Sequence, residues 1–421
     1  MGTVLDVPNL PALRIATAGS VDDGKSTLIG RLLHDTKTVF EDQLAAVHTA
    51  SRRYGDGEIN LALLTDGLRA EREQGITIDV AHRYFATPLR SFIVADTPGH
   101  AQYTRNMVTG ASTADVAVVL VDARHGVVEQ TRRHAFIASL LGVRAIALAV
   151  NKMDLVEWDE AEFNAVAKDL AGYVEALPTP VPMVAFPISA LDGDNVVVRS
   201  TSSPWYGGPS LLAWLETFDA GVHAQPQIAA RLDVQRVIRP HGSDFRGYAG
   251  RLAGRSLVLG ETMTAQPSGR TATIVGLNRF GRAIGIAWPG QAITVELADD
   301  LDVARGDVLV AGASACTETV TGHVCWMIDQ PLREGSRFWF KHGTCTGRAV
   351  VESVEYVHDL HSLEPVPADQ VELNDLAVVR LSLSESIVVE PYAVSREGGR
   401  LILVDEATNS TAGAMMITAA A

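Results

Sequence analysis

The sequence is poor in the features that mark secreted, metal-binding and membrane proteins. It has only three cysteines in 421 residues, Cys316, Cys325 and Cys345, with no C-x-x-C spacing and no histidine pair to complete a metal set. We expect small buried thiols in a reducing compartment. The first eleven residues lack a signal-peptide pattern, and no apolar run approaches the roughly 20 residues of a membrane helix. These absences predict a soluble, cytoplasmic chain with no membrane partner.

Basic charge is scarce as well. Lys and Arg number 35 against 50 Asp and Glu, which gives a formal net charge of −15 at pH 7. A surface with that balance repels a phosphate backbone, so no nucleic-acid partner is expected. Hydrophobic residues, in contrast, make up 47% of the chain. The chain is therefore long and apolar enough for two or three packed domains.

Apolar strands alternate with helical segments over residues 12–218. The alternation predicts a doubly wound, mostly parallel sheet, whose ligands bind beyond the carboxyl ends of its strands. The expected strands are Leu13–Ala18, Ser91–Ala95, Val116–Asp122, Ala145–Asn151 and Met183–Ser189. Helices are expected in the stretches between them, such as Ser26–His34, Gln130–Leu141 and Asp159–Glu175.

The helical pattern stops near residue 219. Short runs rich in Val, Ile, Thr and aromatic residues follow, separated by Gly, Pro, Asn and Asp, which is typical of antiparallel barrels. The clearest runs are Ala229–Ile238, Thr271–Leu277, Ala292–Leu297, Arg337–Lys341, Gly347–Tyr356 and Leu376–Leu383. We predict an α/β domain over residues 1–222 and two β-barrels over 223–313 and 314–421.

A phosphate-binding motif follows the first expected strand. Residues 19–26 read Gly-Ser-Val-Asp-Asp-Gly-Lys-Ser and match G-x-x-x-x-G-K-[ST]. The glycines allow a tight loop whose amides cradle phosphate oxygens, Lys25 can reach the β- and γ-phosphates, and the Ser26 hydroxyl can ligate Mg²⁺. The helix that follows favours an anion at its start. The expected phosphate-binding residues are Gly19, Ser20, Val21, Asp22, Asp23, Gly24, Lys25, Ser26 and Thr27.

Four candidate residues for hydrolysis lie farther along. Asp96 ends a strand and can hold Mg²⁺ through water, while the Gly99 amide can donate to a γ-phosphate. His100 could orient the attacking water, or it could be a structural turn residue. Thr77 could complete the Mg²⁺ shell and sense the γ-phosphate, or it could be an ordinary strand threonine.

A base-reading motif, Asn151-Lys152-Met153-Asp154, begins at the end of the expected strand Ala145–Asn151. The Asp154 carboxylate can accept hydrogen bonds from guanine N1–H and the 2-amino group, which adenine lacks, and such pairing supports discrimination of roughly 10⁴. Asn151 can bond the guanine edge and the loop, and the Lys152 stem can cover the ring. After the last strand, Ser189, Ala190 and Leu191 offer a backbone N–H for guanine O6. GTP is therefore the expected substrate and GDP the expected product.

In this order the motifs resemble those of the translational-GTPase superfamily of the elongation factor Tu type, in which a P-loop GTPase domain precedes two β-barrels. Gly75–Ile78 and Gln130–His134 are similar as well. Within the superfamily the chain most resembles the GTPase subunits of bacterial heterodimeric sulfate adenylyltransferases. Translation factors usually carry histidine where this chain has Ser20 and Asp23. Leu61–Asp79, Val237–Pro240 and Phe245–Gly250 are further similar segments.

The resemblance implies a Mg²⁺-dependent GTPase that couples GTP hydrolysis to formation of adenosine 5′-phosphosulfate and pyrophosphate from ATP and sulfate. A separate small ATP-binding subunit would carry out adenylyl transfer, and this chain has no H-x-G-H or S-G-G-x-D-S segment for that task. The resemblance also implies that Val21 and Ile76 form an apolar gate restraining His100. The alternatives are a translation-factor GTPase and a GTP-dependent switch without coupled chemistry.

Overall fold

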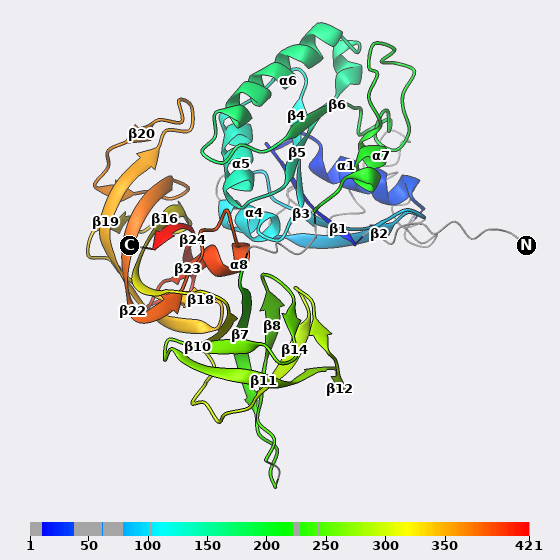
Figure 1. The fold of residues 1–421 in the computed structure, drawn as a ribbon. Coiled ribbons are helices and arrows are strands. Elements are labelled where there is room, and N and C mark those ends of the chain that lie inside the picture. The colour runs from blue at the N-terminus through cyan, green and yellow to red at the C-terminus, as the bar shows by residue number, and fades with distance from the viewer. Residues whose placement is uncertain are drawn as a thin grey trace, which may run out of the picture. The chain divides into compact units, whose positions relative to one another are not determined.

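The computed structural model describes residues 11–37, 61, 79–100, 103–221, 228–242 and 244–420 (Figure 1). They divide into two compact units, the first comprising the described residues before 222 and the second nearly all of those after it. Within these ranges no helix has the length and apolar character needed to cross a membrane. The predicted domain boundaries, 1–222, 223–313 and 314–421, remain predictions.

A six-stranded sheet forms the centre of the first unit. Its strand order is β2-β3-β1-β4-β5-β6, and every neighbouring pair is parallel except β2 with β3. The strands are β1 (Leu13–Gly19), β2 (Ala81–Ala86), β3 (Ser91–Asp96), β4 (Val116–Asp122), β5 (Ala145–Asn151) and β6 (Met183–Pro187). The predicted mostly parallel sheet is confirmed. The phosphate loop follows β1 and the base-reading motif follows β5, so both lie at the carboxyl edge.

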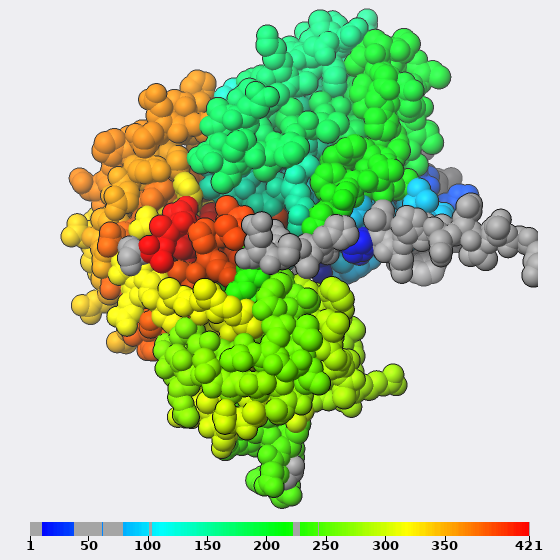
Figure 2. Space-filling model, in the orientation of Figure 1, coloured from blue at the N-terminus to red at the C-terminus, as the bar shows by residue number. Residues whose placement is uncertain are grey.

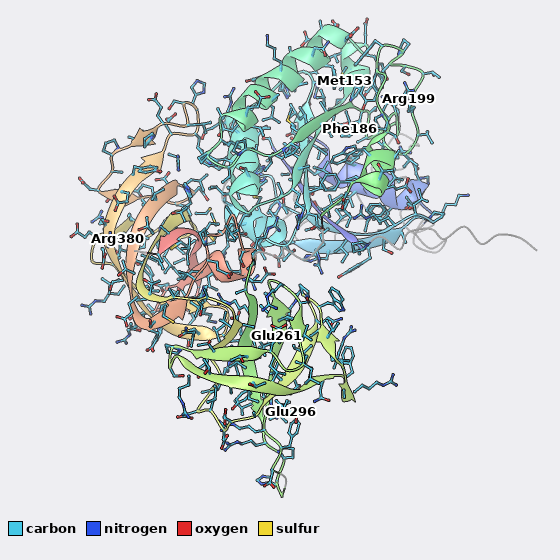
Figure 3. The ribbon with its side chains drawn as sticks, in the orientation of Figure 1. Met153, Phe186, Arg199, Glu261, Glu296 and Arg380 are labelled. Atoms are coloured by element: carbon cyan, nitrogen blue, oxygen red, sulfur yellow. The ribbon has the colours of Figure 1, made fainter. Side chains whose placement is uncertain are left out.

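Helices cover both faces of this sheet (Figure 1). They are α1 (Lys25–Asp35), α4 (Thr104–Ala111), α5 (Glu129–Leu140), α6 (Glu160–Glu175) and α7 (Leu211–Thr217), together with the 3₁₀ turn η3 (Met153–Val156). Because both faces are covered, all residues of β4 and β5 are buried. Met153 and Phe186 are fully buried beside the carboxyl edge (Figure 3). Met153 thereby anchors the turn that carries Asp154.

The strand β2 and the helix α7 were not predicted from the sequence. In β2 only Phe85 is buried, where it stacks on Phe92 with ring centroids 4.6 Å apart. The more covered positions of this edge strand, Ala81, Arg83 and Phe85, include an arginine, and an aromatic residue, Tyr84, is exposed, so apolar and polar residues do not alternate along its sequence. The end of β6 was also placed too late, since the strand stops at Pro187 and Ser189 lies in the following turn.

Two closed six-stranded antiparallel barrels form the second unit, as predicted. The first closes in the order β10-β15-β7-β8-β14-β11 and the second in the order β18-β23-β24-β16-β22-β19. The first consists of β7 (Ala230–Ile238), β8 (Gly247–Ala253), β10 (Thr262–Gln266), β11 (Arg270–Arg279), β14 (Ala292–Leu297) and β15 (Val308–Ala311). The second consists of β16 (Cys316–Trp326), β18 (Arg337–His342), β19 (Cys345–His358), β22 (Leu376–Val388), β23 (Arg400–Val404) and β24 (Thr411–Ala420).

The two barrels are in contact within this unit (Figure 2). Buried Arg231 of the first barrel donates from Nη1 to the Val388 carbonyl of the second at 2.8 Å, and its Nη2 lies 3.0 Å from His342 Nε2. Asp233 accepts from Arg231 Nε at 2.8 Å and so neutralises the guanidinium. A buried cation with this many partners holds the barrels together as one unit.

Candidate functional site

The phosphate loop joins the end of β1 to the start of α1. Gly24 has φ 94°, and a Cβ there would lie 2.4 Å from Asn151 Nδ2. A Cβ on Gly99 would lie 2.9 Å from both the carbonyl carbon and the carbonyl oxygen of Ser20. Both positions therefore require glycine, and Gly99 lies directly against the loop. Because α1 begins at Lys25, the free backbone amides of its first turn lie at the end of the phosphate loop.

The Lys25 side chain is buried inside the loop. Its ammonium donates to the carbonyls of Gly19 at 3.2 Å and Ser20 at 2.6 Å. Burial lowers the pKa of Lys25, and the nearby carboxylates of Asp23 and Asp96 oppose that change. A cation so placed can meet a phosphate oxygen at the loop.

Asp23 lies in the interior of the loop rather than on its surface. Its carboxylate is 6% exposed and accepts the Ser20 amide at 2.5 Å. Burial raises the pKa of Asp23, whereas Lys25 and the bond from Ser20 lower it. The side chain thus stabilises the loop. We therefore expect Asp23 to contact phosphate through its backbone amide and not through its carboxylate.

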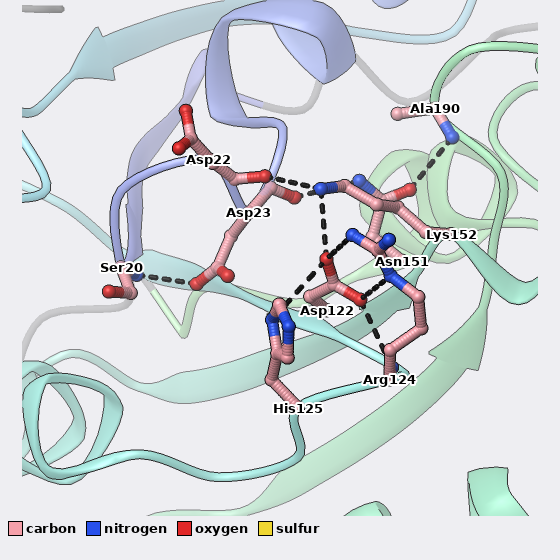
Figure 4. A network of polar contacts seen from close by, with 9 residues as sticks. All are labelled: Ser20, Asp22, Asp23, Asp122, Arg124, His125, Asn151, Lys152 and Ala190. Carbon is pink, nitrogen blue, oxygen red and sulfur yellow. Dashed lines mark hydrogen bonds and ion pairs between the residues drawn. The ribbon is translucent and has the colours of Figure 1, made fainter. Parts of the chain in front are cut away.

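Asn151 connects three segments that are far apart in the sequence (Figure 4). Its Nδ2 donates to the Asp23 carbonyl at 2.7 Å, and its Oδ1 accepts the Ala190 amide at 2.9 Å. The phosphate loop, the base-reading motif and the Ser189–Leu191 turn are thereby brought together, as the sequence predicts. Asp154 lies one turn farther on in η3, and the Ser189 hydroxyl is 2.9 Å from Asp192 Oδ2.

Lys152 joins the base-reading motif to the phosphate loop by a second path. Its ammonium donates to the Asp22 carbonyl at 2.6 Å and lies 2.9 Å from Asp122 Oδ2 (Figure 4). Asp122 and its partner Arg124, at the end of β4, were not predicted from the sequence as parts of the site. An aspartate at the carboxyl end of a parallel strand was the available signal.

His134 is another residue whose role the sequence did not reveal. It lies on α5, is fully buried, and accepts the Gly19 amide on Nδ1 at 3.0 Å. Burial, helped by Lys25 and Arg133, lowers the pKa of His134 to about 3. The ring is therefore neutral at physiological pH, as an acceptor must be.

Two oxygen donors suited to Mg²⁺ lie at this site. Asp96 ends β3 and is buried, with Oδ1 3.4 Å from the Thr17 hydroxyl, and Ser26 is in the first turn of α1. Hydroxyl and carboxylate oxygens match the ligands that Mg²⁺ prefers when substrate phosphates complete its shell. The described residues contain no cluster of three or more His, Cys, Asp or Glu that could bind a metal by itself. The three cysteines form no disulfide.

Of the four residues expected to orient the attacking water, sense the γ-phosphate or form the apolar gate, the structure describes two, His100 and Val21. His100 follows Gly99 and is half-buried, with its ring centroid 6.2 Å from that of Tyr103. Val21 is partly exposed in the phosphate loop. Thr77 and Ile76 lie outside the described residues.

Comparisons with known proteins agree with this geometry. A family model described as the elongation factor Tu GTP binding domain matches residues 10–237, and one described as GTP-eEF1A C-terminal domain-like matches residues 319–418. The chain is 48% identical over 409 residues to sulfate adenylyltransferase subunit 1 of Sodalis glossinidius, covering 96% of this chain and 86% of that protein.

Further relatives carry the same name. The subunit 1 proteins of Tolumonas auensis and Methylorubrum extorquens are also 48% identical, over 97% and 96% of this chain and 87% and 86% of theirs. Among solved structures, sup35 complexed with GDP covers 100% of this chain and 97% of its own, with a TM-score of 0.44 and 20% identity.

Proposed function

Because this chain belongs to the sulfate adenylyltransferase subunit 1 family, within the GTPases of the elongation factor Tu type, we propose that it is the GTPase subunit of a sulfate adenylyltransferase. It couples GTP hydrolysis to the uphill formation of adenosine 5′-phosphosulfate and pyrophosphate from ATP and sulfate. Relatives at 48% identity carry that enzyme's name, which favours this function over that of a translation factor.

The observation that carries the proposal is the pair of bonds made by Asn151. One amide side chain bonds the phosphate loop at 2.7 Å and the Ser189–Leu191 turn at 2.9 Å, so phosphate and base sites share one frame. In that frame Asp154 reads guanine N1–H and the 2-amino group, and the Lys152 stem covers the ring. An adenine base would leave the carboxylate unpaired, which disfavours ATP.

Hydrolysis uses residues from three segments. The amides of the phosphate loop and of Gly99 orient the β- and γ-phosphates, and the Lys25 ammonium offsets their charge. Ser26, Asp96 and Thr77 would hold Mg²⁺, which supplies further positive charge when bound. His100 orients the attacking water, a role that its position directly after Gly99 supports. Preorganised charge of this kind stabilises the transition state without a covalent step.

A second subunit completes the enzyme in this proposal. The relatives are named subunit 1, which supports an assembly with another chain, and adenylyl transfer belongs to that small ATP-binding partner. The net charge of −15 makes a nucleic-acid partner unfavourable.

The purified chain tests the division of labour. By itself it should bind GTP in preference to ATP and hydrolyse it at roughly 10⁻⁴–10⁻² s⁻¹, the range of unassisted GTPases. It should release no pyrophosphate from ATP and sulfate. Pyrophosphate release by the chain alone, or equal affinity for ATP and GTP, would contradict the proposal.

A further inference from the structure

We infer that Asp122 is a positioning residue of the nucleotide site, whose carboxylate, held by Arg124, fixes the Lys152 ammonium against the phosphate loop (Figure 4). The inference rests on the proposed GTP site and deepens it. It assigns a function to a strand-end aspartate and an arginine that no part of the phosphate or base motifs includes.

The Asp122 carboxylate lies at the carboxyl edge of the sheet. Asp122 is the last residue of β4, between the strands that precede the phosphate loop and the base-reading motif, and is 2% exposed. Its Oδ2 is 2.9 Å from Lys152 Nζ, which also donates to the Asp22 carbonyl at 2.6 Å. Lys152 itself has φ 62°, an unfavourable left-handed backbone that neighbouring contacts must stabilise.

Arg124 makes this buried carboxylate a strong acceptor. Its Nε and Nη2 donate to Asp122 Oδ1 and Oδ2 at 3.0 and 2.6 Å, and its amide donates to Oδ1 at 3.0 Å. Burial raises the pKa of Asp122, but the bonds from Arg124 and Lys152 outweigh burial, so the pKa lies well below its usual range. His125 adds a nitrogen 3.7 Å from Oδ2. The carboxylate is therefore charged at neutral pH.

Loss of the Asp122 charge should weaken the binding of a guanine nucleotide. The Lys152 ammonium is fixed by two acceptors, one on β4 and one on the phosphate loop. Without the Asp122 charge only the loop carbonyl remains, and the lysine stem is free to leave the base. Base recognition and loop geometry would then weaken together, because the same ammonium serves both.

The test is the dissociation rate of a fluorescent GDP analogue from the full chain. Asp122→Asn should speed dissociation about tenfold or more, the effect of one lost charge-assisted hydrogen bond. Lys152→Met should have at least as large an effect, because it also removes the bond to the Asp22 carbonyl. The double variant should dissociate no faster than Lys152→Met, because the contact that Asp122→Asn removes is already lost there. Inosine diphosphate, which lacks the 2-amino group, should be affected by the same factor as GDP, because Asp154 is untouched.

Two further variants sharpen the result. Asp169→Asn removes a carboxylate that pairs with Arg132 elsewhere in the first unit and is 46% exposed, and it should leave the rate unchanged. Arg124→Gln, at a side chain that is 43% exposed, should speed dissociation by a smaller factor, and it keeps the inference testable if Asp122→Asn does not fold.

Three outcomes would overturn the inference. The first is that the GDP analogue dissociates from both Asp122→Asn and Arg124→Gln at the wild-type rate. The second is that the effects of Asp122→Asn and Lys152→Met on the dissociation rate are fully additive. The third is that Asp169→Asn speeds dissociation as much as Asp122→Asn does. If the wild-type chain binds no guanine nucleotide at all, the proposed function fails and the inference fails with it. Tight GDP binding with no effect of the variants removes the inference alone.

Discussion

The Nδ1 nitrogen of His134 accepts the backbone amide of Gly19 at 3.0 Å, so a helix residue fixes the first residue of the phosphate loop. The other ring nitrogen lies 2.8 Å from the Gln130 side-chain amide. An acceptor on Nδ1 requires a neutral ring, and protonation would turn that nitrogen into a donor facing another donor. The loop therefore depends on His134 staying uncharged.

This relationship predicts a pH dependence of stability. Burial lowers the pKa of His134 to about 3, whereas the unfolded chain protonates near 6.5. Between these values the unfolded state binds the extra proton, so stability falls as pH drops below 6.5, by about 1.4 kcal/mol per pH unit. His134→Asn keeps an acceptor oxygen without a titrating group and should lose that part of the slope.

Amide hydrogen exchange in β1 and β4 at pH 7, 6 and 5 measures the opening free energy of the first unit in both proteins. Equal slopes for wild type and His134→Asn would show that the ring is not held neutral.

Gly24 should tolerate no side chain. Alanine there adopts an unfavourable φ of 94°, at about 1 kcal/mol, and its Cβ also meets Asn151 Nδ2. We expect Gly24→Ala to lose GTP binding by 100-fold or more because Asn151 must move. Gly126→Ala is the matched control, with φ 68° and nothing within 4 Å of the added Cβ, and should bind GTP normally. Equilibrium titration compares the two, and equal affinities would refute the steric argument.

Asp154 should determine the choice of base. Asp154→Asn replaces the carboxylate acceptor by an amide that matches the 2-oxo group of xanthine. GTP affinity should fall and xanthosine triphosphate affinity should rise, with a combined change of roughly 10³ or more. Dissociation constants for both nucleotides check this prediction. An unchanged preference for GTP would remove Asp154 from the base site.

Much of this site could be predicted from sequence, because a phosphate loop and a base-reading motif are local patterns with fixed spacing. The sequence also indicated that Asn151 would reach the loop, although 128 residues separate it from Asp23. Asp122, Arg124 and His134 were not found, since an aspartate at a strand end and a histidine on a helix are common in structural roles. Their function depends on partners brought together only by the sheet order β1-β4-β5. The edge strand β2 was missed because apolar and polar residues do not alternate along its sequence.

In the proposed function, GTP hydrolysis on this chain drives sulfate activation by the assembled enzyme. Pyrophosphate and GDP release should be measured together in the complex of this chain with its small partner, using wild type and His100→Ala. We expect GTP-dependent pyrophosphate release by wild type. We expect His100→Ala to bind GTP almost normally but to lose both GDP release and pyrophosphate release by roughly 10² or more, the effect of removing a positioned catalytic side chain. Pyrophosphate release at the wild-type rate in the absence of GTP, or by a complex that carries His100→Ala, would contradict this coupling.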